Sequence, residues 1–318
     1  MEVKFWGTRG SIPTPLSAEV IQQKIRYALE GAAGLDLEDP TALERYVDRL
    51  PLNIRGTIGG NTTCVEIRDG DQLLIIDAGS GLRLLGGELM VQGFAAGDKR
   101  ADFLISHSHW DHIQGFPFFG PAFIRNNHFA FHSPFPDLAD RLSHQQDEVF
   151  FPVPVTYMSA TLEFKQIAPD TWHQIGRFRV LPMRLSHPGP TYAYRVETDD
   201  ASLVFASDGE YKRLARADTE RFVQFFKDAD LLIFDAQYSL SESLDKYDWG
   251  HSSAVMGAEL AHRACVKRLA LFHHDPTSSD EKVLLAQEEA EAYLQSARRN
   301  DCKCRVLVAY EGLSLSLS

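Results

Sequence analysis

The sequence predicts a fold of mixed α/β (α+β) class with one helical insertion near the N-terminus. Short apolar strand patterns alternate with helical patterns along the 318-residue chain, which is typical of sheets covered by helices. Several of these strands end directly at a His or an Asp. No linker rich in Pro, Gly or Ser divides the chain. We therefore expect a single domain over residues 1–318, although the length would also suit about two domains.

Two segments differ from the strand-rich remainder. Residues 17–50 repeat apolar side chains at helical spacing, and Asp39-Pro40 interrupts the pattern, which predicts two helices. They belong to an insertion over 17–57, which either covers the active site or builds an interface. Residues 115–160 are rich in Phe, Pro and His with little periodicity, which predicts a long covering loop with one helix.

The other elements are short apolar strands and a few helices, whose ends are marked by turn residues or by a change of period. The predicted strands are 3–6, 63–67, 73–76, 102–105, 162–166, 178–185, 192–197, 203–206, 231–234, 268–272 and 304–310. The helices predicted outside the insertion are 82–85, 136–149, 219–226, 252–266 and 281–299.

The composition is that of a globular protein. Apolar residues make up 44% and charged residues 24%, which excludes a disordered tail, a collagen-like repeat and a coiled coil. The chain has 32 Lys and Arg against 44 Asp and Glu, so its net charge is −12. Extended nucleic acids are bound mainly through Lys and Arg. We therefore expect no such partner, whereas a small anionic substrate held by metal ions is compatible with this charge.

We expect a cytoplasmic protein without a membrane segment. The apolar runs are far shorter than the roughly 20 residues that span a bilayer, and residues 1–6 show no signal-peptide pattern. The spacing of Cys64, Cys265, Cys302 and Cys304 predicts no disulfide framework, which favours a reducing compartment. The C-x-C pair Cys302 and Cys304 is interpreted as two side chains on one strand face, with a metal-binding or redox role as the alternative.

The strongest functional signal is the segment 107–112, which directly follows an apolar strand. It contains three imidazoles and one carboxylate, which are ligands that suit zinc, iron or manganese. Without a metal, these adjacent polar groups would each need a buried partner. The candidate ligands in this segment are His107, His109, Asp111 and His112.

This segment has more donors than one tetrahedral ion with an open position can use, so we expect a second ion. Further donors should then come from later strand ends. His187, Asp208 and His273 each follow an apolar strand. Each is weak evidence alone, but together they predict a site with two metal ions.

The H-x-H-x-D-H segment resembles the central motif of the metallo-β-lactamase superfamily, and Asp77, His187, Asp208 and His273 resemble its other motifs. The resemblance implies a four-layer αββα sandwich and a metal-dependent hydrolase with two divalent ions, zinc or alternatively manganese or iron. By the same resemblance, one ion binds His107, His109 and His187. The other binds Asp111, His112 and His273, and Asp208 bridges the two.

Three further segments, 5–11, 59–64 and 250–253, resemble the branch that holds tRNase Z-like enzymes, cyclic nucleotide phosphodiesterases and the phosphoribosyl cyclic phosphate phosphodiesterase. The long Gly/Pro-rich arm of tRNase Z has no counterpart. The resemblance implies hydrolysis of a small cyclic or nucleotide-type phosphodiester, and a homodimer. A tRNase Z-like nuclease and a thioester or lactone hydrolase remain alternatives, since the same metal centre serves all three.

The implied mechanism is attack of a metal-bound hydroxide on phosphorus, with Asp111 both binding metal and orienting the water. His251 is the candidate general acid, because it lies outside the ligand set and imidazole titrates near working pH. A helix-capping or surface role is the alternative.

The remaining site candidates are supporting residues. Asp77 is expected to orient a ligand histidine, or else to end its strand in a turn. Asp235 ends another strand near the site, and its role is open. Strand alternation lets only one of His273 and His274 face the metals; we expect His273, with His274 behind the ligands or towards substrate.

Arg9 and Asn61 lie in the glycine-containing segments that carry the branch resemblance. Both side chains suit a phosphate contact, and both equally suit a role in the turns themselves.

Overall fold

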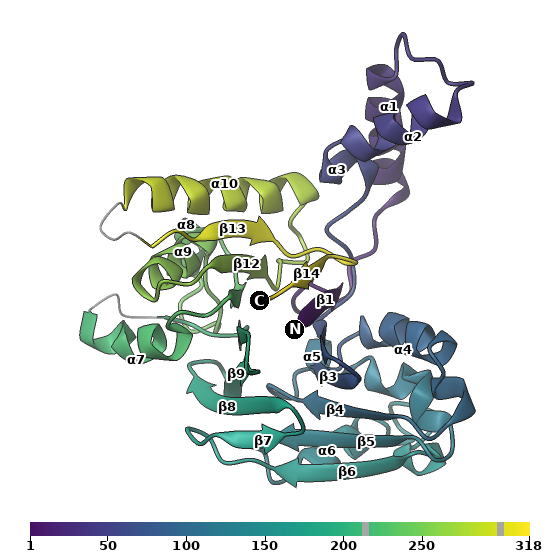
Figure 1. Ribbon diagram of the computed structural model, residues 1–318, viewed down its shortest axis with the longest axis vertical. Coiled ribbons are helices and arrows are strands. Elements are labelled where there is room, and N and C mark those ends of the chain that lie inside the picture. The colour runs from purple at the N-terminus through teal and green to yellow at the C-terminus, as the bar shows by residue number, and fades with distance from the viewer. Residues whose placement is uncertain (212–215, 298–301) are drawn as a thin grey trace.

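The computed structural model of the protein describes residues 1–211, 216–297 and 302–318. Two seven-stranded sheets pack face to face, and helices lie on their outer faces (Figure 1). This is the four-layer helix–sheet–sheet–helix arrangement that the family resemblance implied. None of the helices within the described residues is long and apolar enough to cross a membrane.

The first sheet has the order β14-β1-β2-β3-β4-β5-β6, and its strands from β3 to β6 are parallel. The strands are β14 (Ser314–Ser316), β1 (Glu2–Gly7), β2 (Cys64–Asp69), β3 (Gln72–Ile76), β4 (Arg100–Leu104), β5 (His128–Ser133) and β6 (Thr161–Gln166).

The second sheet has the order β13-β12-β11-β10-β9-β8-β7, and its strands from β10 to β13 are parallel. The strands are β13 (Arg305–Val308), β12 (Arg268–Phe272), β11 (Leu231–Asp235), β10 (Ser202–Ala206), β9 (Thr191–Glu197), β8 (Phe178–Leu185) and β7 (His173–Ile175).

The core between the sheets takes side chains from both of them. Phe5 of β1 meets Phe272 of β12 with ring centroids 6.0 Å apart, and Phe205 of β10 packs against the same ring. Burying a phenylalanine of this kind contributes about 1.5–3 kcal/mol. Because one core joins the two sheets, we propose that the chain forms a single domain.

Each sheet has a second core on its outer face. On the first sheet this core includes Leu82, Leu85 and Leu89 of α4 (Leu82–Val91). On the second sheet it includes residues of α7 (Arg216–Phe226), α9 (Ala254–Arg263) and α10 (Asp280–Ser296). The remaining helices of the body are short: α5 (Trp110–Ile113), α6 (Leu138–His144), α8 (Leu240–Asp245), η1 (Phe94–Ala96), η2 (Phe116–Phe118), η3 (Gly120–Phe123) and η4 (Val155–Tyr157).

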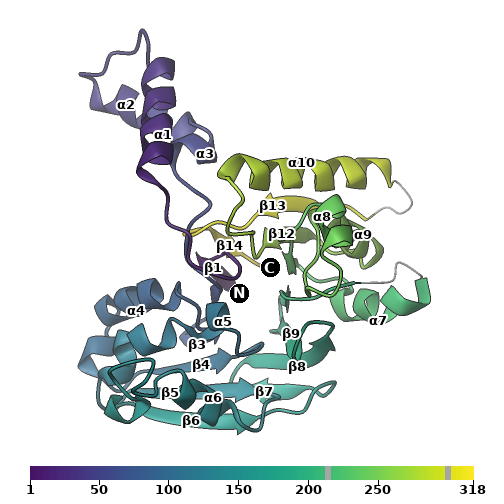
Figure 2. The ribbon, with the colours of Figure 1, turned by 180° about the vertical axis from the view of Figure 1, so that it is seen from behind.

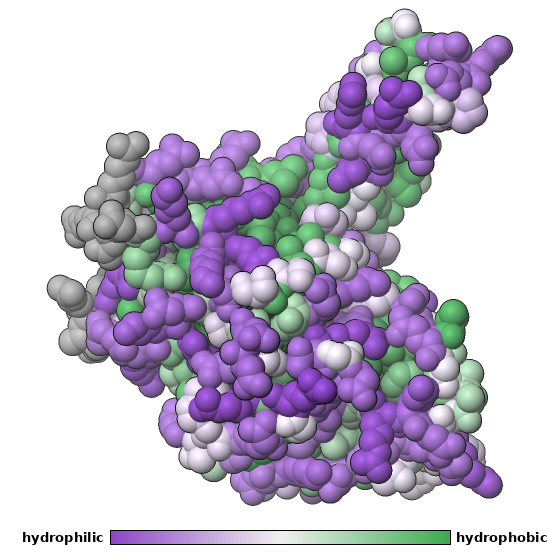
Figure 3. All heavy atoms as spheres, viewed as in Figure 1, coloured by the Kyte–Doolittle hydropathy of each residue, from purple (hydrophilic) through white to green (hydrophobic). Residues whose placement is uncertain are grey.

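The predicted insertion is a helical arm that projects from the body (Figures 1 and 2). It contains α1 (Ala18–Gly31) and α2 (Pro40–Arg49), as predicted, and an unpredicted third helix, α3 (Leu52–Arg55). The Ser17 side chain caps α1, and Asp39 caps α2 directly before Pro40. Within the described chain neither α1 nor α2 has a buried residue, and Figure 3 shows the arm projecting away from the rest of the surface.

The predicted loop over 115–160 is wrong in part, because it contains β5, the last but one strand of the first sheet. The helix predicted at 136–149 is the shorter α6. The sequence pattern also gave no indication of β7, β14 or α8. The helix predicted at 281–299 is present as α10, and its predicted positions 298 and 299 lie outside the described residues.

Cys265 and Cys302 form a disulfide with Cα atoms 5.2 Å apart, which corrects the prediction from cysteine spacing. The two residues are 37 positions apart in the chain. They meet because β12 and β13 are neighbours in the sheet, which cysteine spacing does not reveal. The cysteines therefore no longer support a reducing compartment. Cys302 and Cys304 both precede β13, so the predicted strand begins later than expected.

Candidate metal centre

The candidate ligands gather at the edge where parallel strands of both sheets end. The strands β3, β10 and β12 end just before Asp77, Asp208 and His273. All three residues have left-handed backbone conformations, with φ of 59°, 58° and 59°. Such conformations are uncommon for residues other than glycine and cluster at functional sites. Each one turns the chain at the strand end and so places its side chain in the shared site.

Two groups of side chains could each hold a metal ion. The first is His107, His109 and His187, and the second is Asp111, His112, Asp208 and His273. Within each group the potential ligand atoms lie within 4.8 Å of one another. Asp208 also approaches the first group, since its Oδ1 is 3.9 Å from His107 Nε2. All seven residues predicted as ligands are therefore brought together.

Hydrogen bonds on the Nδ1 side fix the orientation of several imidazoles. His112 Nδ1 lies 2.7 Å from Asp77 Oδ2, which is the predicted contact of Asp77 with a ligand histidine. His187 Nδ1 donates to the Gly250 carbonyl at 2.9 Å, and His273 Nδ1 donates to Gln237 Oε1 at 2.9 Å. Partners of this kind leave Nε2 as the nitrogen available for metal.

Two ring nitrogens in the centre of the site are left without hydrogen bonds. His107 Nε2 is buried and has no hydrogen-bond partner among the described residues. His112 Nε2 lies 3.3 Å from Asp111 Oδ2 and 3.2 Å from Asp208 Oδ2, but is aligned for a hydrogen bond with neither. An orphaned buried nitrogen is costly, and a divalent cation in each group of side chains would satisfy the nitrogen of that group.

The electrostatics of the site favour a bound cation. Burial lowers the pKa of His107 well below its usual range, which keeps the ring neutral. Burial also opposes a charge on His112, but the carboxylates of Asp208, Asp111 and Asp77 outweigh it and raise its pKa. The negative charge of these carboxylates therefore favours a positive charge at His112. This charge is either a proton on the ring or a metal ion that takes the place of the proton, since metal binding displaces ligand protons.

His251 lies beside this centre and pairs with Asp235. Its Nδ1 is 2.8 Å from Asp235 Oδ2, and its ring stacks on His273 with centroids 5.1 Å apart. These three residues and Asp208 form a further group of potential ligands. The His251 atom that approaches Asp208, at 4.0 Å, is Nδ1, which is already bonded to Asp235.

A cavity of about 420 Å³ opens over the site. His109, Asp111, Asp208, His251 and His273 line it together with Ser11, Ser108 and Trp110. The indole of Trp110 is 80% exposed, although it sits between two candidate ligands in the sequence. Among the described residues no Lys or Arg lines this cavity and none of 17–57 does, so the arm does not cover the site.

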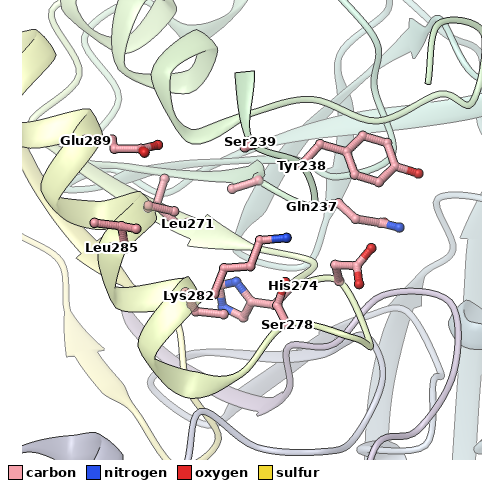
Figure 4. A pocket seen from close by; sticks show the side chains of 13 residues that line it. Gln237, Tyr238, Ser239, Leu271, His274, Ser278, Lys282, Leu285 and Glu289 are labelled. Atoms are coloured by element: carbon pink, nitrogen blue, oxygen red, sulfur yellow. The ribbon is translucent and has the colours of Figure 1, made fainter. Parts of the chain in front are cut away.

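His274 points away from the candidate ligands, in agreement with strand alternation. Its Nε2 donates to the Ala309 carbonyl at 2.9 Å, and burial lowers its pKa to about 3. Figure 4 shows His274 and Lys282 of α10 in the lining of a small cavity of about 70 Å³, which Gln237 also lines. His274 is therefore a buried neutral residue behind the site rather than a substrate-facing one.

Arg9 and Asn61 do not reach the cavity. Arg9 is buried, and its guanidinium donates to the carbonyls of Gly59, Asp275 and Ser278. Asn61 donates to Glu311 and accepts a hydrogen bond from Ser80. Of the two roles left open for them, these contacts correspond to the role in the turns, because carbonyls and side chains of neighbouring loops already use these donors.

Sequence reasoning missed three residues that hold the ligands. Gln237 follows Asp235 by two positions and binds His273. Ser106 directly precedes the histidine motif and donates from both its backbone N–H and its hydroxyl to Asp77, each at 2.7 Å. The Ser11 N–H donates to Asp111 Oδ2 at 2.7 Å. Proximity to a ligand in the sequence could have suggested Ser106, but not Ser11.

Comparisons with known proteins agree with this geometry. The family model described as beta-lactamase superfamily domain matches residues 73–274. The ribonuclease Z of Thermoplasma acidophilum is 25% identical over an alignment of 274 positions, which covers 71% of this chain and 85% of the relative.

Two solved structures have the same fold. The metallo-beta-lactamase fold protein YhfI from Bacillus subtilis has a TM-score of 0.65 at 17% identity. The match covers 99% of this chain and 98% of the YhfI chain. Yeast PDE1 has a TM-score of 0.63 at 16% identity and covers 99% of each chain.

Proposed function

The chain belongs to the beta-lactamase superfamily, and from this premise we propose that it is a dinuclear phosphodiesterase acting on a small cyclic or nucleotide-type phosphodiester. The observation that carries the proposal is the His251–Asp235 pair, with a 2.8 Å contact, in the wall of the cavity that the candidate metal ligands also line. A proton donor at this place serves a reaction whose leaving group is a strongly basic oxygen.

The proposed ligands of one ion are His107, His109 and His187. Those of the other are Asp111, His112, His273 and Asp208, with Asp208 shared because it lies near both groups. The unpartnered nitrogens of His107 and His112 support this assignment. Divalent ions here, most simply zinc, supply an activated water and positive charge for the phosphoryl oxygens.

The proposed role of His251 is to protonate the leaving oxygen. Its Nδ1–H donates to Asp235, so Nε2 is the ring nitrogen left to carry a proton towards the cavity. Asp235 also accepts hydrogen bonds from the backbone N–H groups of Asp208, Gln237 and Ser252. These bonds hold the carboxylate still, so the imidazole that it binds has one orientation.

Trp110 supports a substrate that carries an aromatic ring. Its exposed indole lines the cavity, and stacking of a base on an aromatic side chain contributes about 1–3 kcal/mol. Since no Lys or Arg among the described residues lines the cavity, the metal ions and not the protein would neutralise the phosphate. Both features favour a small substrate.

Cleavage of RNA is the second candidate, because the curated relative named above is a ribonuclease Z. The charge of the chain weighs against it. Besides the net charge of −12, the arm over 17–57 carries seven acidic and five basic residues. A surface that grips RNA needs the opposite balance.

Hydrolysis of bis(p-nitrophenyl) phosphate by protein loaded with zinc or with manganese tests the proposal. We expect turnover that disappears in Asp208→Ala, and no faster cleavage of a structured RNA than of cyclic nucleotides. Absence of turnover in protein shown to hold two ions would contradict the proposal and favour a thioester or lactone substrate.

A further inference from the structure

A second set of His and Cys side chains lies outside the candidate centre, where α9 ends and β13 begins. Cys265 follows α9 and is joined to Cys302, which precedes β13. A cavity of about 430 Å³ lies at this point, lined by His262, Cys302 and Cys304 and by Glu291 and Leu294 of α10. It contains no residue of the candidate phosphodiesterase site.

The strand direction places both cysteines of the C-x-C pair on the side of the helices. Val306 and Val308 of β13 pack in the core that α9 and α10 share, and Cys304 packs against the same core. Side chains two positions apart lie on the same face of an extended segment. Cys302, Cys304 and Val306 therefore face α9 and α10, in agreement with the contact between Cys302 and Cys265.

His262 supplies an unsatisfied nitrogen to this cluster. It lies in the last turn of α9, is only 6% exposed, and its Nε2 has no hydrogen-bond partner among the described residues. The Cys265 N–H donates to the His262 carbonyl at 3.2 Å, so the two residues are held on one turn. His262 lines the same cavity as Cys302 and Cys304 and lies three positions before Cys265. A buried ring nitrogen without a partner in such surroundings indicates a cation that binds nitrogen and sulfur ligands.

We propose that, in the reduced protein, His262, Cys265, Cys302 and Cys304 bind one zinc ion. Three thiolates and one imidazole form a closed tetrahedral set that is typical of structural zinc sites. The pattern is H-x₂-C on a helix end and C-x-C before a strand. Such an ion would join α9 to β13, which is the same pair of elements that the disulfide joins.

The two states interconvert by thiol chemistry. Two equivalents of a thiol reductant break the Cys265–Cys302 bond, deliver two electrons and two protons, and are themselves oxidised to a disulfide. Zinc then displaces the protons of the three cysteine thiols. The Cα atoms of Cys265 and Cys302 are 5.2 Å apart, which is close enough for both sulfurs to reach one ion.

Cobalt(II) provides the test, because a thiolate bound to cobalt gives a charge-transfer absorption that imidazole and carboxylate ligands do not. The full-length protein is reduced with a phosphine, freed of the reductant under anaerobic conditions and titrated with Co²⁺. We expect the thiolate band in reduced protein and no band in the disulfide form. Because the His/Asp centre contains no sulfur, this result is independent of the proposed activity.

The variants Cys304→Ser and His262→Gln should each lower the affinity of the reduced protein for cobalt, measured from the thiolate band, by at least about tenfold. The control is Cys64→Ala, which removes a cysteine buried in a different core and should leave the band unchanged. The proposal is overturned if reduced wild-type protein shows no thiolate band, or if the band keeps its affinity in both Cys304→Ser and His262→Gln.

Discussion

Asp235 Oδ2 accepts a hydrogen bond from His251 Nδ1 at 2.8 Å and another from the backbone N–H of Asp208 at 3.0 Å. One carboxylate oxygen therefore positions both the proposed proton donor and a strand end that carries a proposed metal ligand. Asp235 is completely buried, so these contacts are not shared with water. In the proposed reaction, this residue would couple proton transfer to metal binding.

Replacing Asp235 by Asn should lower kcat by about 10- to 100-fold. The amide keeps one acceptor oxygen but turns an NH₂ group towards donors, which should also cost about 1–3 kcal/mol of stability. Steady-state kinetics and denaturant unfolding measure the two effects.

Asp230→Asn is the matched control, because Asp230 precedes β11 at the opposite end of the strand from Asp235 and pairs with Lys267. It should leave kcat unchanged. Equal kcat values for wild-type protein and Asp235→Asn would show that the pair does not act in the reaction.

Divalent metal should stabilise the fold, since seven candidate ligands lie in two compact groups. At a free zinc concentration 100 times the dissociation constant, one site adds about 2.7 kcal/mol to the free energy of unfolding. Calorimetric unfolding with zinc and with a chelator measures this difference. The difference between zinc and chelator should be smaller in Asp208→Asn. It should persist in the control variant Asp102→Asn, because the Asp102 carboxylate of the wild-type protein pairs with His132. Identical unfolding with zinc and with chelator would refute the ligand assignment.

Trp110→Ala should raise KM for a cyclic nucleotide by about 5- to 150-fold, which corresponds to the loss of about 1–3 kcal/mol of stacking. Because the indole is 80% exposed, stability should change by less than about 0.5 kcal/mol. Trp110→Phe should restore most of the affinity. Tyr157→Ala removes another exposed aromatic side chain that does not line the cavity, and its KM should equal that of wild type. A KM unchanged in Trp110→Ala would exclude the stacking role.

The buried His274 should make the fold sensitive to acid. Burial lowers its pKa from 6.5 to about 3, so between these values the unfolded chain binds a proton that the folded chain does not. Its contribution to stability is complete above pH 6.5 and is lost as pH falls towards 3, by up to about 1.4 kcal/mol per pH unit. His274→Gln keeps a donor for Ala309 but does not titrate. Urea unfolding between pH 7 and pH 4 should therefore show a shallower decline for the variant, and parallel declines would contradict this account.

Much of the site was predictable because its signals are local. The motif 107–112 and the residues Asp77, Asp208 and His273 each directly follow an apolar strand. Parallel strands of one sheet end at a common edge, which places Asp77 beside the motif in the first sheet and Asp208 beside His273 in the second. The meeting of the two pairs depends on the packing of one sheet on the other. The insertion was predictable for the same reason, since helical spacing and the Asp39-Pro40 break are visible in the sequence alone.

What could not be predicted depends on contacts between distant segments. The strand β5 lies in a segment whose sequence is typical of a loop. Its place in the sheet becomes visible only through contacts with β4, such as that of His132 with Asp102. The Cys265–Cys302 disulfide depends on the pairing of β12 with β13. Arg9 looks like a phosphate ligand, but the carbonyls that it binds lie as far away in the chain as Ser278.

The most direct test of the central claim compares leaving groups in wild-type protein and His251→Ala. Single-turnover rates are measured for two phosphodiesters, one that releases p-nitrophenolate and one that releases an alkyl alkoxide. If His251 protonates the leaving oxygen, its loss should slow the alkoxide reaction by about 10²- to 10⁴-fold and the nitrophenolate reaction far less. Equal losses for the two substrates, in protein that retains its metal, would contradict the account.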